Sequence, residues 1–237
     1  MKKKETDFLL DVYIHGETIN LCVPTIQYAS DSTWYSWLND LYVTRFLEQG
    51  LEVNTPEKQV EFYKSLASSN RLSLIISDKE NYIGTISLSG INLVKKTCEI
   101  ALLFGEKSHQ PNSEMMALEA MARLTTFAFD QMGIERISAG QHHKLLKWQQ
   151  KLELIGYKIE GIKKTGFRKG REVADGVSIA ITSEEYNSIT SKRKALWDDV
   201  DSMRTRVSKL PANPIVNKLR EFYDTEIKNY YTHIFNL

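Results

Sequence analysis

Apolar residues recur along this chain with two different periods, and the change of period marks a strand followed by a helix. Between residues 98 and 104 most positions are apolar, which is typical of a strand buried on both faces. From Met116 to Ala128 apolar residues recur every three or four positions, which predicts a helix capped by Ser113 and ended by Gly133. A second strand, IERIS, follows at 134–138. The helix N-terminus thus comes soon after a buried strand, an arrangement that favours binding of an anion.

The same patterns predict further elements on both sides of this unit. Thr55 followed by Pro56 is a typical helix start, and Gly156 is a typical helix end. Strands are expected at 17–23, 71–77, 82–88, 157–162 and 173–181, and helices at 32–38, 55–67 and 143–155. The predicted fold class is α+β, with one mixed and mostly antiparallel sheet flanked by helices.

The last quarter of the chain has a different pattern, so we expect two parts, residues 1–183 and 184–237. Apolar residues spaced by four, three, four and three form a seam: Leu196, Val200, Met203, Val207 and Leu210. The segment 211–214 (PANP) predicts a turn, and a second amphipathic helix follows over 215–234. The extension is therefore predicted to be a helical hairpin. It either packs on its own domain, joins two copies in a homodimer, or binds another partner.

The composition of the chain bears on its expected partners, its location and its cysteine chemistry. The net charge of +1 gives no general basic excess, so nucleic acid is an unlikely partner. No run of eighteen apolar residues occurs and the start of the chain has no apolar signal-like core, so we expect a cytoplasmic protein with no membrane contact. Cys22 and Cys98 lie in apolar strand-like runs and are interpreted as buried hydrophobic residues. Neither a disulfide nor a metal site is predicted.

Four segments, in this order, resemble the GNAT superfamily of acyl-CoA N-acyltransferases. They are TWYSWLNDLYVTRFLEQG (33–50), NYIGTISLSGINLVKKTCEIALLFGEK (81–107), LELIGYKIEGIKK (152–164) and DGVSIAITSEEY (175–186). The chain is most similar to the branch that contains ribosomal-protein and amino-sugar acetyltransferases. The resemblance implies the GNAT-like fold and transfer of an acetyl group from acetyl-CoA, without a metal, to the primary amine of a small molecule. An amino sugar, free or linked to a nucleotide, is the favoured acceptor, and a protein N-terminus is the alternative.

The resemblance also implies where acetyl-CoA binds. Backbone groups of the predicted strand and residues of the loop after it would hold the cofactor: Leu102, Leu103, Phe104, Lys107, His109, Gln110, Asn112 and Ser113. The family has small residues at two loop positions so that backbone N–H groups can approach the pyrophosphate, whereas this chain has Ser113 and Met115 there. Pro111 lacks an N–H, and Glu114 adds a carboxylate. A GNAT-like module that binds a partner and has lost catalysis is therefore the alternative function.

Catalysis in this family needs a base that deprotonates the amine and an acid that protonates the leaving thiolate. Glu99 is the first candidate base, because it lies in the strand that carries the acyl group, and His142 with His143 comes second. Relatives place a tyrosine acid where this chain has Leu152, which leaves water or Tyr157. The segment 33–50 lines the acceptor cleft in the family and supplies the candidate substrate contacts Trp34, Arg45, Phe46 and Glu48. The basic run 158–171 is interpreted as a solvated turn or as an attractant for phosphate.

Overall fold

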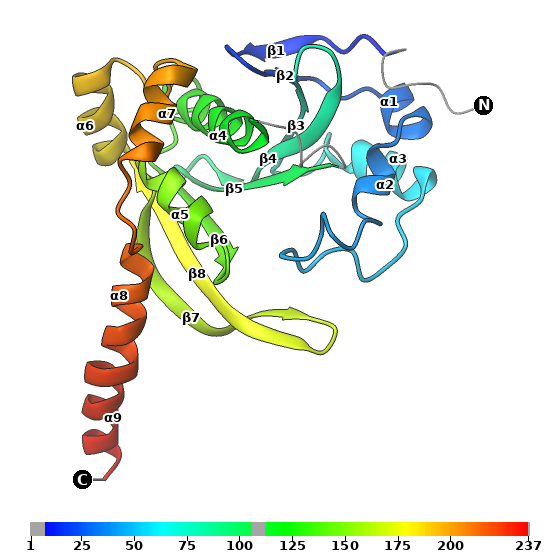
Figure 1. Ribbon diagram of the computed structural model, residues 1–237. Helices are drawn as coiled ribbons and strands as arrows, with labels where there is room; N and C mark the ends of the chain where they lie inside the picture. Colours follow the sequence, from blue (N-terminus) through cyan, green and yellow to red (C-terminus); the bar gives the residue numbers. More distant parts are fainter. Residues whose placement is uncertain (1–7, 106–111, 237) are drawn as a thin grey trace.

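The computed structural model describes residues 8–105 and 112–236, and its centre is a single mixed sheet (Figure 1). The strand order is β1-β2-β3-β4-β5-β6-β8-β7. The strands are β1 (Val12–His15), β2 (Asn20–Cys22), β3 (Leu72–Ser77), β4 (Tyr82–Asn92), β5 (Thr97–Phe104), β6 (Arg136–His142), β7 (Lys158–Lys169) and β8 (Glu172–Thr182). Within the described residues β5 and β6 run parallel, and the other neighbouring strands run antiparallel. The predicted α+β class, with one mixed and mostly antiparallel sheet flanked by helices, is confirmed.

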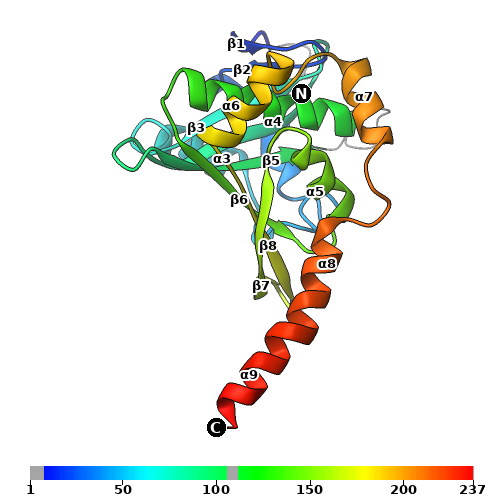
Figure 2. The ribbon, with the colours of Figure 1, turned by 90° about the vertical axis from the view of Figure 1, so that its left-hand side faces the viewer.

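Helices cover both faces of the sheet (Figures 1 and 2). They are α1 (Ile26–Asp31), α2 (Trp34–Trp37), α3 (Pro56–Ser65), α4 (Ser113–Asp130), α5 (Leu146–Glu153), α6 (Ser183–Arg193), α7 (Val200–Ser208), α8 (Ile215–Phe222) and α9 (Lys228–Phe235), with a π-helical turn, η3 (Tyr223–Ile227), between the last two. Alternation along β3 shows how the faces divide. Leu74 and Ile76 pack in the main core with α4, whereas Ile75 belongs to a second cluster beneath α1 to α3.

The local signals for helix α3 act as the sequence predicts. Thr55 precedes the helix, and its Oγ1 accepts a hydrogen bond of 3.3 Å from the backbone N–H of Lys58. Pro56 occupies the first helical position, where no N–H is needed. The hairpin of β7 and β8 differs from the prediction because it extends beyond the expected 157–162 and 173–181. The outer part of the hairpin is polar and mostly exposed. The two strands therefore stay paired over residues that have no apolar pattern from which a strand could be predicted.

The C-terminal extension also differs from the expected hairpin. Leu196 and Met203 of the predicted seam are fully buried in the core of their own chain, and α7 packs against α4. The seam therefore matches the first expected role, packing on its own domain. After the turn at 211–214, the helix from α8 to α9 leads away from the body instead of returning along α7 (Figures 1 and 2). Among the described residues, no helix is long and apolar enough to cross a membrane.

Candidate active site

The two parallel strands separate beyond their first three residue pairs. β5 and β6 are in register from Thr97 with Arg136 to Glu99 with Ser138, and among the described residues no further pair follows. β6 instead remains paired with β8 over its whole length. A gap therefore opens between the C-terminal halves of β5 and β6, and it exposes main-chain groups of β5 that a neighbouring strand would otherwise bind.

The direction of the β5 main chain shows which N–H groups face this gap. The N–H of Gly105 donates to the carbonyl oxygen of Ile83 at 2.8 Å, and the register between β4 and β5 is regular from Glu99 to Phe104. Because hydrogen bonding alternates along a strand, the N–H of Leu103 points to β4, while those of Leu102 and Phe104 point into the gap. Two of the three predicted backbone contacts, Leu102 and Phe104, therefore direct their N–H groups into the gap.

A cleft of about 650 Å³ covers the start of this gap on the face opposite α4. Its floor carries hydroxyl and carboxylate side chains from four strands: Ser89, Glu99, Ser138 and Ser178. Its roof comes from residues 46–49 and from the hairpin of β7 and β8, including Lys163 and Phe167. The cleft is therefore polar below and partly aromatic above.

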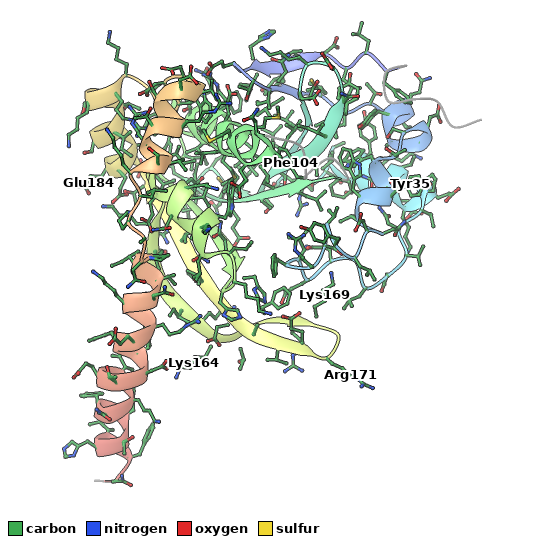
Figure 3. All side chains as sticks on the ribbon, viewed as in Figure 1. Tyr35, Phe104, Lys164, Lys169, Arg171 and Glu184 are labelled. Atoms are coloured by element: carbon green, nitrogen blue, oxygen red, sulfur yellow. The ribbon has the colours of Figure 1, made fainter. Side chains whose placement is uncertain are left out.

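The two parts of the roof are joined by hydrogen bonds at the end of the hairpin. Lys169 lies on the hairpin of β7 and β8 (Figure 3). Its ammonium donates to the carbonyl oxygens of Thr44 at 2.5 Å and Gln49 at 2.8 Å. The backbone N–H of Arg168 donates to Oε1 of Glu48 at 3.2 Å. Burial lowers the pKa of Lys169, although Glu172 opposes this effect. These bonds hold residues 44–49 across the cleft.

Glu160 and Glu99 are two carboxylates of the cleft, and only Glu160 is paired with a cation among the described residues. Glu160 accepts two hydrogen bonds from Arg136, at 2.7 and 2.5 Å, and this bonding lowers the pKa of Glu160. Glu99 is exposed on the floor, and within residues 8–105 and 112–236 it has neither an ion pair nor a hydrogen-bonded partner for its carboxylate. Glu99 is thus available to attract an ammonium group and to accept its proton.

His142 lines the cleft but is almost fully buried in an aromatic cluster. Its ring lies 4.8 Å from that of Phe46 and 4.5 Å from that of Phe167. Nδ1 accepts a hydrogen bond of 3.1 Å from the N–H of Lys144, so the neutral ring carries its proton on Nε2, 3.4 Å from Glu172. Burial and the neighbouring His143 lower the pKa of His142. These contacts suit a residue that supports the roof.

The predicted substrate residues do not all meet in this cleft. Phe46 and Glu48 line it. Trp34 is buried and lines a second cavity beside the cleft. Arg45 is exposed and stacks its guanidinium 3.7 Å above the centre of the Tyr42 ring, and it lines neither cavity. Sequence reasoning missed Phe167 and Lys163, although both stand in the basic run that it noted.

The N-terminus of α4 lies at a separate hollow of about 520 Å³. Asn112 adopts a left-handed conformation, with φ of 76°, and its Oδ1 accepts a 2.8 Å hydrogen bond from Arg204 of α7. Glu114 forms an ion pair with Lys151, so the carboxylate that would oppose a phosphate is neutralised. Ser113 lines the same hollow. The predicted contacts Lys107, His109 and Gln110 lie outside the described residues.

This hollow combines a helix N-terminus with basic side chains, which is typical of a site for an anion. The positive end of an 18-residue helix lies here with two cations that each also pair with a carboxylate: Lys151 with Glu114, and Arg204 with Asp201. Arg204 lies 92 residues after Asn112, so only the folded chain shows that the extension contributes to this hollow.

Tyr157 does not reach the cleft. Its hydroxyl lies 2.8 Å from Oγ1 of Thr125 in the core, and burial raises its pKa. The earlier suggestion that Tyr157 protonates the thiolate is therefore wrong, and Leu152 is likewise fully buried. In the part of the chain that the structure describes, no group of three or more His, Cys, Asp or Glu residues is arranged to hold a metal ion.

Comparison with known families agrees with this geometry. Residues 21–158 match the family described as "Acetyltransferase (GNAT) domain". The chain belongs to the GNAT acetyltransferase family. Enzymes of this family use acetyl-CoA. Among curated protein sequences, none is significantly similar to this chain.

Solved structures of GNAT enzymes share the fold at low sequence identity. A spermidine N-acetyltransferase SpeG chimera from Vibrio cholerae and hSSAT is 16% identical with a TM-score of 0.60, over 72% of this chain and 99% of that one. The microcin C7 self-immunity acetyltransferase MccE, in complex with acetyl-CoA and AMP, is 18% identical with a TM-score of 0.60, over 70% and 93%. RimJ of Mycobacterium smegmatis, in complex with CoA-disulfide, is 15% identical with a TM-score of 0.61, over 70% and 83%.

Proposed function

We propose that this GNAT acetyltransferase moves an acetyl group from acetyl-CoA to the primary amine of an amino sugar, with a nucleotide-linked amino sugar as the favoured acceptor. One observation carries the proposal: the gap between β5 and β6 opens into a roofed cleft whose floor holds the carboxylate of Glu99, which has no paired cation among the described residues. The gap provides main-chain donors, and the carboxylate provides the base.

Different residues of the site have different roles in the proposed acyl transfer. Bound acetyl-CoA supplies the activated acyl group. The N–H groups of Leu102 and Phe104 face the gap and can donate to a carbonyl oxygen there, which stabilises negative charge that develops on that oxygen. Glu99 attracts the ammonium form of the acceptor and takes its proton, so that the neutral amine can attack the carbonyl carbon. The bond between that carbon and the sulfur of CoA then breaks as the nitrogen loses a second proton, and the leaving thiolate takes up a proton from water. Asn112, Ser113, Lys151 and Arg204 are the proposed partners of the diphosphate.

The shape and polarity of the cleft support a sugar as the acceptor. Hydroxyl groups of Ser89, Ser138 and Ser178 line the floor and suit a ring with several hydroxyls. Phe46 and Phe167 form an apolar surface in the roof on which a sugar face can pack. Lys163 lines the same cleft, and no carboxylate pairs with it within the described ranges, so it is the proposed contact for a phosphate of the linked nucleotide.

The test is an acceptor screen that follows release of free CoA from acetyl-CoA by the purified chain. The panel contains a nucleotide-linked amino sugar, the same amino sugar without its nucleotide, spermidine and a peptide with a free N-terminus. We expect the highest kcat/KM for the nucleotide-linked sugar and a higher KM for the free sugar, because Lys163 then has no phosphate to bind. A preference for the peptide would replace the proposal with protein N-terminal acetylation. Failure to bind acetyl-CoA in isothermal titration would favour the non-catalytic module.

A further inference from the structure

A second cavity of about 280 Å³ lies beside the cleft, beneath α2 and α3 and against β3, β4 and β5. We call it the inner pocket. Most of its exposed wall is aromatic and aliphatic, from Trp34, Trp37, Leu38, Phe62 and Leu103 among others. Polar side chains also line it: Gln49, Asn54, Gln59, Arg71, Ser73, Thr85 and Ser87. Leu47, Gln49 and Ala101 line both this pocket and the cleft, so the two cavities adjoin at these residues. Neither the proposed base nor the proposed sugar contacts use the inner pocket.

The inner pocket begins close to the place where the acyl group of a bound cofactor would lie. Glu99 and Ala101 point to the same face of β5, and two residues along a strand span about 7 Å. The acceptor amine approaches on the Glu99 side. The inner pocket begins on the other side of Ala101, next to Leu102, whose N–H faces the gap. A chain attached to a carbonyl carbon at Leu102 can therefore extend into the inner pocket without crossing the path of the amine.

The chemistry of the inner pocket favours an apolar occupant. Among the described residues no carboxylate lines it, and Arg71 at its border stacks toward the Phe62 ring at 5.7 Å, so these residues offer an ammonium group no counter-charge. Two hydroxyl groups on the floor of the inner pocket already have hydrogen-bond partners within the protein. Oγ1 of Thr85 donates to the carbonyl oxygen of Leu74 at 3.0 Å, and Oγ of Ser73 lies 3.4 Å from Oγ1 of Thr85. The exposed remainder is mainly aromatic and aliphatic side chains.

We propose that the inner pocket binds the hydrocarbon part of acyl groups longer than acetyl, so that medium-chain acyl-CoA is a substrate of this enzyme. This inference rests on the proposed function, because it assumes an acyl-CoA in the gap. A water molecule, similar in size to a methylene group, occupies about 30 Å³ in the liquid, so a chain of about four to six carbon atoms needs about 120 to 180 Å³. The inner pocket, at about 280 Å³, has room for such a chain. Aromatic walls make this burial favourable.

Isothermal titration of the full chain with acetyl-, butyryl- and hexanoyl-CoA tests the proposal without any acceptor. Burial of one methylene group contributes about 0.8 kcal/mol, which is a factor of about four in affinity. We therefore expect hexanoyl-CoA to bind at least about tenfold more tightly than acetyl-CoA, even if its chain is only partly buried. Equal dissociation constants for the three compounds, or weaker binding of hexanoyl-CoA, would overturn the proposal.

Two matched variants on β4 locate the effect. Ser87 faces the inner pocket and Ser89 faces the cleft, two residues further along the same face. Ser87→Leu fills the inner pocket, so we expect the affinity for hexanoyl-CoA to fall to that for acetyl-CoA, while acetyl-CoA binding changes less than about twofold. Ser89→Leu adds the same bulk outside the pocket and should retain the preference for the longer chain. An unchanged preference in Ser87→Leu would contradict the proposed location.

The outcomes separate this inference from the function on which it rests. If the chain binds acetyl-CoA and shows no gain with chain length, the enzyme keeps its proposed function and the inner pocket has another role. If no acyl-CoA of any length binds, both proposals are wrong. The chain-length series uses the unmodified protein, so its result does not depend on whether either variant folds.

Discussion

Replacing Glu99 by glutamine removes the proposed base and little else. The two side chains have nearly the same shape, and the carboxylate of Glu99 makes no hydrogen bond or ion pair within the described structure. The free energy of unfolding should therefore change by no more than about 0.5 kcal/mol. A positioned general base contributes a factor of about 10² to 10⁴ in rate, so we expect kcat to fall by at least about 100-fold, or about 3 kcal/mol in the barrier.

The KM for the amine should rise as well. A carboxylate and an ammonium 4 Å apart in a water-like environment attract each other by about 1 kcal/mol, which is about a fivefold change in KM. Steady-state release of free CoA, measured from pH 6 to 9, gives both constants. At high pH more of the acceptor is already neutral, so we expect the deficit in kcat/KM of the variant to shrink as pH rises.

Glu160 offers a matched control in the same cleft. Its carboxylate is already occupied by Arg136, so Glu160→Gln should cost about 0 to 1 kcal/mol of stability and leave kcat within about threefold. The reasoning about Glu99 fails if both variants lose activity equally. It also fails if Glu99→Gln, folded and able to bind acetyl-CoA, retains a kcat within about fivefold of the unmodified enzyme.

Three further changes test other parts of the site. Lys169→Met removes the ammonium that joins the hairpin to residues 44–49, so the KM for the amine should rise about tenfold with a smaller change in kcat, and an unchanged KM would rule out a role of this bond in acceptor binding. Arg204→Gln should weaken acetyl-CoA about fivefold in isothermal titration, whereas equal affinity would exclude Arg204 as a diphosphate contact. The lowered pKa of His142 means that the unfolded chain takes up its proton more readily than the folded chain, so stability is full above about pH 6.5 and is lost as pH falls below it. His142→Gln should therefore flatten the loss of urea midpoint between pH 7.5 and 5.5, and an equally steep loss would show that other groups cause it.

The sequence predicts the centre of this fold well because the centre is where burial leaves a regular pattern. The apolar run of β5, the three-and-four spacing of α4 and the cap at Thr55 all act locally. Glu99 could be named as a candidate because it is the one charged residue of β5. The expectation that this strand is buried on both faces is wrong, because Glu99 and Ala101 are exposed on the face that lines the cleft.

The remaining parts of the site depend on contacts between distant segments. The seam from Leu196 to Leu210 shows an apolar helix face, but its spacing does not reveal whether that face meets its own domain or a second copy. Asn112 meets Arg204 only because α7 packs on α4. Trp34 and Phe46 come from one predicted segment, yet they line different cavities because residues 44–49 turn across the cleft.

The direction of the C-terminal helix has a consequence for the solubility of the protein. β7 is the last strand of the sheet, and an exposed edge strand can pair with a strand of another molecule. Helix α8 packs beside β7, and the hydroxyl of Tyr223 lies 3.7 Å from the position that a side chain on Gly161 would take. The helix thus covers the part of this edge near Gly161. A chain shortened after residue 214 would keep its catalytic cleft but expose a strand that can start aggregation.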